Sequence, residues 1–407
     1  MKTKQLCYVM LVLSLTFGGA SGADINDIKA AAVGNTDFAF ALYGKLKGEP
    51  KAAKDNIFFS PYSISTALAL VYAGSRGETE KQMAAALCFT LPADKLHSAF
   101  GDLQKQLIHT DKSSGYQLLV ANALWGQKGE PFLKEFLDIT ENCYGAGLRQ
   151  LDFIGQTEQS RQTINLWVEE KTKEKIKDLI PPGGVNRDTV LVLTNAIYFK
   201  GDWQTQFKKE KTKNADFAVS ANRKVKVPMM YLKEDFKYYK DRNLQALELA
   251  YKGDEISMLV LLPNKKEGLA QVESTLSADS LNGFLSKMHT TEVEVYLPKF
   301  KLVWGTFSLN KALIELGMPD AFEGGKADFS GMNGKRDLWI SDVLHKAFIE
   351  VNEEGTEAAA ATAVVVMKAS MPIEPPVFRA DHPFIFIIRD NRSGSILFMG
   401  RMANPAE

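Results

Sequence analysis

The side chains that most often do chemistry in proteins are sparse in this chain, and they form no local catalytic motif. Its five histidines never stand four residues apart, as a helical metal-binding pair would: His97, His109, His289, His345 and His382. The 407 residues contain no Gly-x-Ser-x-Gly, His-Glu-x-x-His or Gly-x-x-x-x-Gly-Lys-Ser/Thr string. We therefore expect no enzyme, no metal and no cofactor.

The cysteines add little information about function. Cys7 lies in an apolar N-terminal stretch, which leaves Cys88 and Cys143 for the rest of the chain. Two cysteines allow one disulfide or two free thiols, and the sequence does not decide between them.

One segment has an unusual composition. Residues 358–367 carry no charge and no proline; they begin with small side chains and end in β-branched ones. Such a segment is typical of a buried strand or an alanine-rich helix, and it would be an aggregation hazard if it were exposed.

The bulk composition describes an ordinary globular chain. Residues are 45% hydrophobic, and 49 Lys plus Arg balance 49 Asp plus Glu. This balance provides no overall basic field for nucleic acid or an anionic membrane, so neither is expected as a partner. No linker-like stretch supports a cut between domains, and we expect a single domain over residues 23–407.

The first 22 residues have the pattern of a secretory signal peptide. Lys2 and Lys4 precede a mostly apolar run from Leu6 to Phe17, and small residues then lead to a cleavage site before Ala23. The apolar run is too short to span a bilayer. We expect an extracellular protein, with Asn391-Arg392-Ser393 as its glycosylation sequon in a hairpin turn.

The elements that position these residues change type along the chain. Helical patterns come first, from Ser60 to Gly74, at 78–87, at 93–107 and at 163–180. Strand patterns follow, with apolar runs at 190–199 and 256–262, alternation at 293–297 and a hairpin at 384–399. Helices first and strands later, without βα alternation, indicate an α+β fold.

Several strings, in order along the chain, resemble those of the serpin family of serine protease inhibitors. The hinge-like string is Glu353, Glu354, Gly355, Thr356, Glu357, Ala358, Ala359, Ala360, Ala361 and Thr362. Others are Asn-Ile-Phe-Phe-Ser-Pro-Tyr-Ser at 56–63, Thr-Asn-Ala-Ile-Tyr-Phe-Lys-Gly-Asp-Trp at 194–203, and Phe-Met-Gly-Arg at 398–401. The resemblance extends over essentially the whole chain after residue 22.

The resemblance implies a single domain of about three β-sheets and eight to nine helices, with an exposed reactive loop. It implies a monomeric suicide substrate: a serine protease cleaves the loop, becomes covalently attached, and is trapped as the loop inserts into the main sheet. Strand alternation fits this role, because Thr356, Ala358 and Ala360 would share the inward face and Glu357 would face outward.

The resemblance also assigns roles to individual residues. Ser60, Ser63, Asn195 and His345 correspond to a polar cluster beneath the parting strands, called the shutter, and we expect His345 to be bonded to Asn195 or a nearby hydroxyl. Trp203 corresponds to the breach, where the loop first enters the sheet.

Family spacing places the cleaved bond at Ala369–Ser370, and alanine at this position suits an elastase-like protease with a small pocket. A shift of one residue would present Lys368–Ala369 to a trypsin-like enzyme, and Met367 or Met371 could suit other pockets.

Three questions stay open from the sequence. A non-inhibitory serpin (a carrier, chaperone or storage protein) is the alternative, although the small hinge residues favour an inhibitor. A secreted hydrolase is a second alternative function. Lys95, His97 and Lys105 lie on one predicted helix but are diluted by Asp94 and Asp102, so we interpret this face as solvated and leave glycosaminoglycan binding undecided.

Overall fold

The computed structural model describes residues 23–49, 55–108, 115–145, 147–355 and 374–407. Within these ranges, ten α-helices and two short 3₁₀ helices accompany two β-sheets. The α-helices are α1 (Ile25–Leu46), α2 (Pro61–Tyr72), α3 (Gly77–Ala86), α4 (Ala93–Leu107), α5 (Lys134–Tyr144), α6 (Thr157–Lys171), α7 (Leu269–Thr275), α8 (Ala278–Lys287), α9 (Asn310–Glu315) and α10 (Ser330–Asn333). The 3₁₀ helices are η1 (Lys209–Lys211) and η2 (Asp320–Phe322).

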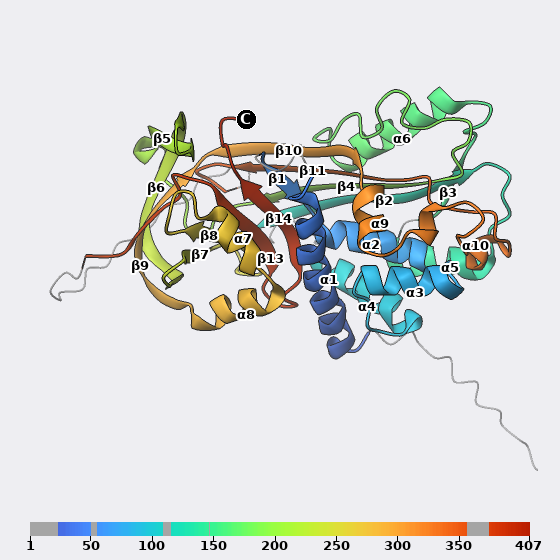
Figure 1. The fold of residues 1–407 in the computed structure, drawn as a ribbon, viewed down its shortest axis with the longest axis horizontal. Helices are drawn as coiled ribbons and strands as arrows, with labels where there is room; N and C mark the ends of the chain where they lie inside the picture. Colours follow the sequence, from blue (N-terminus) through green and yellow to red (C-terminus); the bar gives the residue numbers. More distant parts are fainter. Residues whose placement is uncertain (1–22, 50–54, 109–114, 146, 356–373) are drawn as a thin grey trace, which may run out of the picture.

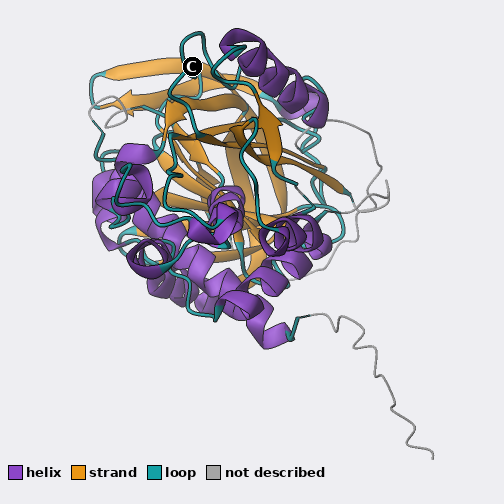
Figure 2. Ribbon diagram, turned by 90° about the vertical axis from the view of Figure 1, so that its right-hand side faces the viewer, coloured by secondary structure: helices purple, strands orange, loops and turns teal. Residues whose placement is uncertain are grey.

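The smaller sheet has long central strands that run horizontally in Figure 1. Its strands, in spatial order, are β10 (Phe300–Ser308), β11 (Asp342–Val351), β4 (Leu191–Gly201), β2 (Tyr116–Gln127) and β3 (Arg149–Leu151). In the view of Figure 2 the strands lie between a large group of helices below and α6 at the top. The described side chains of β4 are almost all buried, as the apolar run at 190–199 predicts for a strand covered on both faces.

The larger sheet lies at the other end of the molecule, beside α7 and α8 (Figure 1). Its nine described strands are β1 (Ile57–Phe59), β14 (Ile396–Met402), β13 (Phe384–Asp390), β8 (Ile256–Pro263), β7 (Leu244–Ala250), β6 (Arg223–Lys240), β9 (His289–Pro298) and β12 (Val377–Arg379) in order, with β5 (Lys213–Ser220) paired to β6. The predicted hairpin at 384–399 is β13 and β14.

The α+β fold class is confirmed, with counts that differ from the expected three sheets and eight to nine helices. The 18 residues of β6 pair with β5 over 223–229, with β9 over 229–238 and with β7 over 237–240. This continuous strand joins two groups of strands into one sheet, so the described residues contain two sheets rather than three.

The helix predicted over 163–180 is wrong in its second half. Helix α6 ends at Lys171, and Lys173, Glu174 and Asp178 all have positive φ angles, which a right-handed helix does not allow. The Thr172 hydroxyl accepts from the Ile176 backbone N–H at 3.2 Å and so ends the helix with a local turn. The apolar residues of this turn are nevertheless buried, and for that reason they continued the helical pattern in the sequence.

The interpretation of 93–107 as a solvated helix face is correct for the lysines and wrong for His97. Lys95 and Lys105 are exposed and form ion pairs with Asp27 and Asp102, whereas His97 is 4% exposed. His97 Nδ1 lies 2.6 Å from the Tyr144 hydroxyl, and burial lowers the pKa of this histidine to about 4. His97 is therefore a neutral core residue that joins α4 to α5.

Among the described residues, no helix combines the length and apolarity needed to cross a bilayer. The same residues contain no cluster of three or more His, Cys, Asp or Glu side chains that could hold a metal ion.

Candidate functional site

The segment singled out in the sequence joins the two sheets. It follows β11 and ends before β12, and its residues 356–373 lie outside the described part of the chain. The hinge residues Thr356–Thr362 and the predicted cleavage positions Lys368, Ala369 and Ser370 are among them. The structure therefore describes the two attachment points of this segment and the sheet that it leaves.

The chain leaves the smaller sheet from a parallel pair of strands. Strands β11 and β4 pair in parallel from Asp342 opposite Val192 to Phe348 opposite Tyr198, whereas β10 and β2 flank them antiparallel. If the chain reversed after β11 and returned between β11 and β4, the new strand would run antiparallel to both. One parallel pairing would then be replaced by two antiparallel ones, which are slightly more stable per residue.

A buried polar cluster crosses the sheet at this pair. Asn122 on β2, Asn195 on β4 and His345 on β11 are direct cross-strand neighbours, so their side chains form one row. Asn195 Nδ2 donates to Asn122 Oδ1 at 2.6 Å, and its Oδ1 lies 2.5 Å from His345 Nδ1. Four of the residues in this cluster are those that the sequence predicted for the shutter: Ser60, Ser63, Asn195 and His345.

Helix α2 closes the cluster from below. Ser60 is its N-cap, with Pro61 in the first turn, and the Ser60 hydroxyl accepts from the Ser63 backbone N–H at 3.1 Å. The same hydroxyl donates to the Leu397 carbonyl at 2.6 Å, while the Ser60 N–H donates to His345 Nε2 at 3.2 Å. Ser63 Oγ accepts from Asn195 Nδ2 at 2.7 Å. A helix terminus, three strands and β14 are thus joined through hydrogen bonds of a few buried side chains.

Asn122 is the member of this cluster that sequence reasoning missed. It bonds Asn195 and donates from Nδ2 to the Ser63 carbonyl at 3.1 Å. The available signal was a single amide in the otherwise apolar strand Leu-Leu-Val-Ala-Asn-Ala-Leu-Trp at 118–125. A polar residue within an apolar strand, even at a partly buried position, needs a hydrogen-bonding partner, and that need points to a network.

The surroundings of His345 determine its protonation state and its tautomer. It is 1% exposed, and burial lowers its pKa to about 3. Since its Nε2 accepts from the Ser60 N–H, the remaining proton is on Nδ1, where it is donated to Asn195 Oδ1. A neutral imidazole in this tautomer satisfies both neighbours, whereas a protonated one would clash with the Ser60 N–H.

This histidine should make stability depend on pH. In the unfolded chain its pKa is about 6.5, so below that value the unfolded state binds a proton that the folded state does not. Stability is therefore retained above pH 6.5 and falls by about 1.4 kcal/mol per pH unit toward the folded pKa of about 3. We expect the urea midpoint to fall from pH 7 to pH 5, and to fall less steeply in His345→Gln.

The matched control is His289→Gln, because His289 is exposed on β9 and far from the cluster. His289→Gln should keep the wild-type slope. An identical slope in His345→Gln would contradict a neutral, buried His345.

Trp203 lies where the chain leaves the sheet. Its indole Nε1 donates to the Asn352 carbonyl at 3.0 Å, and its backbone N–H donates to the Glu354 carbonyl, also at 3.0 Å. Its ring stacks on Tyr251 with centroids 4.5 Å apart, and the residue is 3% exposed. The predicted breach residue therefore contacts the start of the hinge directly and holds it at the end of β4.

The two hinge glutamates are anchored. Glu353 is 4% exposed, accepts from Thr212 Oγ1 at 2.8 Å and pairs with Lys299 Nζ at 2.8 Å. Burial acts to raise its pKa, but the bonds from Lys299 and Thr212 outweigh burial, and the pKa lies below its ordinary value. Glu354 forms an ion pair with Lys209. Both side chains fix the chain to η1 and its surroundings.

Gly355 is required by a close approach. Its φ is +134°, and a Cβ built there would lie 2.2 Å from the Gly201 carbonyl oxygen. The glycine lets the chain pass directly over the end of β4 and pair with Asp202. The backbone can therefore turn at this residue, immediately before the segment that begins at 356.

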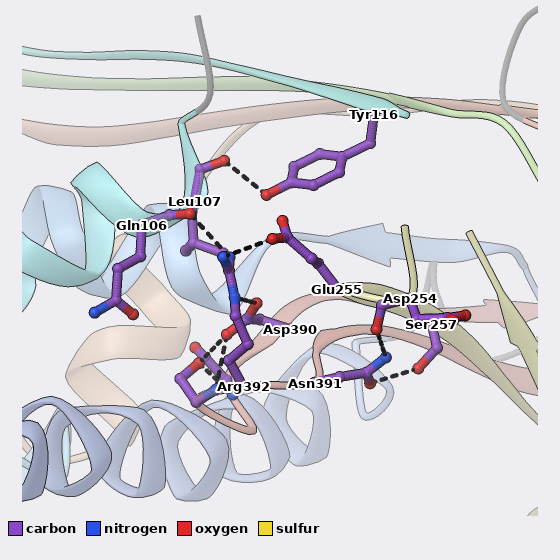
Figure 3. A network of polar contacts seen from close by, with 11 residues as sticks. Gln106, Leu107, Tyr116, Asp254, Glu255, Ser257, Asp390, Asn391 and Arg392 are labelled. Carbon is purple, nitrogen blue, oxygen red and sulfur yellow. Dashed lines mark hydrogen bonds and ion pairs between the residues drawn. The ribbon is translucent and has the colours of Figure 1, made fainter. Parts of the chain in front are cut away.

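Asn391 begins the turn between β13 and β14, and Figure 3 shows that its side chain forms hydrogen bonds. Its Nδ2 donates to the Asp254 carbonyl at 2.8 Å, and its Oδ1 accepts from Ser257 Oγ at 2.9 Å. One amide hydrogen is left for a sugar linkage, so glycosylation stays a prediction. The next side chain, Arg392, contacts the Gln106 carbonyl, Glu255 and Asp390, and ties the turn to the end of α4 (Figure 3).

The two cysteines that the structure describes are both free. Cys88 and Cys143 are half-buried and form no disulfide with each other. Burial raises the pKa of both thiols, so neither has the lowered pKa of a reactive cysteine.

Comparison with known proteins extends over nearly the whole chain. The family model for serpin (serine protease inhibitor) matches residues 33–405. Leukocyte elastase inhibitor of Xenopus tropicalis is 45% identical over 376 residues, which cover 91% of this chain and 98% of that protein. Leukocyte elastase inhibitor of Homo sapiens is 44% identical over 380 residues, with the same coverage.

Solved structures with the same fold include uncleaved ovalbumin, at a TM-score of 0.83 and 31% identity, covering 92% of this chain and 100% of that one. Serpin48 of the insect Tenebrio molitor has a TM-score of 0.81 and 34% identity, covering 93% and 98%. Human thyroxine-binding globulin complexed with thyroxine has a TM-score of 0.84 and 30% identity, covering 94% of this chain and 100% of that one.

Proposed function

Because this chain belongs to the serpin family of serine protease inhibitors, we propose that it inhibits a serine protease as a suicide substrate. The protease cleaves the segment after Gly355 and forms an acyl-enzyme. The released segment then folds back between β11 and β4 before the ester is hydrolysed, and the attached protease is distorted. The inhibitor is consumed, and the complex stays covalent.

The observation that carries this proposal is the geometry at the end of the β11–β4 pair. The segment starts at the strand end, from a glycine with a positive φ angle, directly above a pair that can take up a new antiparallel strand. Roughly a dozen new ladder hydrogen bonds, at about 0.5–1.5 kcal/mol each, would release about 6–18 kcal/mol. The uncharged inward set of Thr356, Ala358 and Ala360 can enter without burying a charge.

The proposed target is an elastase-like protease cleaving Ala369–Ser370. Alanine before the bond suits a small specificity pocket, and the similar proteins include leukocyte elastase inhibitors. Lys368–Ala369, for a trypsin-like protease, is the alternative bond.

A protease panel tests both the mechanism and the bond. We expect incubation with an elastase-like protease to give a complex that survives denaturing gels, together with a released peptide that begins at Ser370. Mass spectrometry of that peptide identifies the bond. A peptide beginning at Ala369 would instead assign the bond to Lys368–Ala369 and favour trypsin-like targets, and cleavage without any stable complex would contradict the suicide mechanism.

We also propose that the protein is secreted after removal of residues 1–22. Support comes from the signal-like composition of those residues and from the surroundings of Ala23, whose backbone nitrogen lies 2.5 Å from Asp102 Oδ2. An α-ammonium group created at Ala23 would pair with this carboxylate. Expression in a secreting eukaryotic cell line, with N-terminal sequencing of the medium fraction and a glycosidase shift for Asn391, tests the proposal.

The second candidate function is that of a carrier. One structural neighbour is a globulin complexed with thyroxine, so the fold also accommodates hormone binding in that protein. The small, uncharged hinge of this chain favours inhibition over a carrier role. The gel assay for a stable complex separates the two functions.

A further inference from the structure

A row of aromatic and cationic side chains crosses the larger sheet near both attachment points of the loop. Tyr231 on β6 is directly opposite Tyr296 on β9, and Tyr296 is directly opposite Arg379 on β12. Direct cross-strand partners project on the same face, so the three side chains form one row. Together with Lys211 and Lys213 they line a cavity of about 410 Å³, which we call the cationic pocket.

The aromatic rings hold two of the cations in place. The Arg379 guanidinium carbon lies 3.8 Å from the centroid of the Tyr296 ring, and Lys211 Nζ lies 5.2 Å from that of Tyr231. The two rings are 5.0 Å apart. The row therefore reads cation, ring, ring, cation, and each cation is positioned by a ring face rather than by a carboxylate.

The cations of the pocket have no carboxylate partner among the described residues, in contrast to their neighbours. Lys224 and Lys226 pair with Asp216, Lys209 pairs with Glu354, and Lys233 pairs with Glu292 and Glu294. Lys211, Lys213 and Arg379 form no such pair, and Glu210 is the single carboxylate in the lining. The pocket thus keeps a net positive charge, because three cations face the one carboxylate of Glu210.

The position of the pocket relates it to the reactive bond. Arg379 ends β12, whose first residue, Val377, is seven residues after Ser370, so the chain from Ser370 to Val377 spans at most about 25 Å. Lys211 ends η1, to which Glu353 and Glu354 are anchored. A protease bound at Ala369–Ser370 would therefore be within reach of this end of the larger sheet.

We propose that the cationic pocket is a secondary docking site for an acidic surface segment of the target protease; this rests on the proposed function and adds to it the chemistry of the partner. Carboxylates of the protease would reach Lys211, Lys213 and Arg379 between the tyrosine rings, and long-range attraction would speed the encounter. A sulfated polysaccharide fits less well, because it needs an extended track of free cations and several adjacent lysines already pair with carboxylates.

The test is a charge reversal that leaves the strands intact, Lys211→Glu with Lys213→Glu. We expect the second-order rate constant for association with the protease trapped in the panel to fall about tenfold at low ionic strength, and the difference to shrink as salt is added. The fraction of protease trapped per inhibitor should stay unchanged, because loop insertion does not involve the pocket. The matched control, Lys81→Glu with Lys134→Glu on α3 and α5, makes the same charge change at the far end of the molecule (Figure 1) and should leave the rate unchanged.

A direct measurement keeps the surface proposal separate from the inhibitory function. A fluorescent octaglutamate peptide should bind the intact wild-type protein and the control variant, and should lose at least tenfold in affinity for the Lys211→Glu, Lys213→Glu variant, even if no protease in the panel is trapped. An unchanged or faster association rate in that variant overturns the proposal, as does equal peptide binding. Weaker retention on heparin with no effect on the association rate also overturns it and assigns the pocket to a polysaccharide.

Discussion

Cleavage of the loop is expected to raise the melting temperature of this protein by tens of degrees. An ordinary nick in an exposed segment adds chain freedom and at best leaves stability unchanged. Here the freed segment would become a strand between β11 and β4, and the estimated gain of about 6–18 kcal/mol is large beside the 5–15 kcal/mol that separates most folded proteins from their unfolded state. Ordering the segment costs entropy and reduces this gain without removing it.

Thermal unfolding of intact and loop-cleaved protein in one buffer measures the effect. The control is protein incubated with the same protease after its active site has been blocked, which should melt like the intact form. A cleaved form that melts at the same temperature or lower would show that the loop does not insert, and would move the protein to the carrier alternative.

The second large effect is expected from Thr356→Arg, which should convert the inhibitor into a substrate. Thr356 directly follows the anchored Gly355, so it would be the first residue to enter the sheet, on the inward face. An arginine there would bring an unpaired charge into the core, at a cost of several kcal/mol. Each 1.4 kcal/mol slows insertion about tenfold relative to hydrolysis of the acyl-enzyme.

We therefore expect cleavage of the Thr356→Arg loop to continue while the gel-stable complex disappears. Glu357→Arg is the matched control, because it introduces the same side chain at the neighbouring, outward-facing position and should still form the complex. A normal yield of complex from Thr356→Arg would refute insertion as the trapping step.

The family and the main strands could be recognised from the amino-acid sequence alone. Ordered strings such as the hinge at 353–362 identified the serpin family and its fold class, and period-two and continuous apolar patterns located β4, β8, β9 and the β13–β14 hairpin. These features are local: a run of apolar or alternating residues can be recognised without knowing its neighbours. For the same reason the pattern at 163–180 misled, because buried apolar residues in a turn repeat much as those in a helix do.

Which residues contact one another became clear from the folded chain and not from the sequence. Asn122 joins Ser63, Asn195 and His345 because β2, β4 and β11 are adjacent in register, and no spacing along the chain encodes that adjacency. The burial of His97 against Tyr144, and the row of Tyr231, Tyr296 and Arg379, likewise depend on strand order and helix packing. Side-chain environments such as these arise from contacts between distant segments, and those contacts set the charge of His345 and leave the cations of the pocket unpaired.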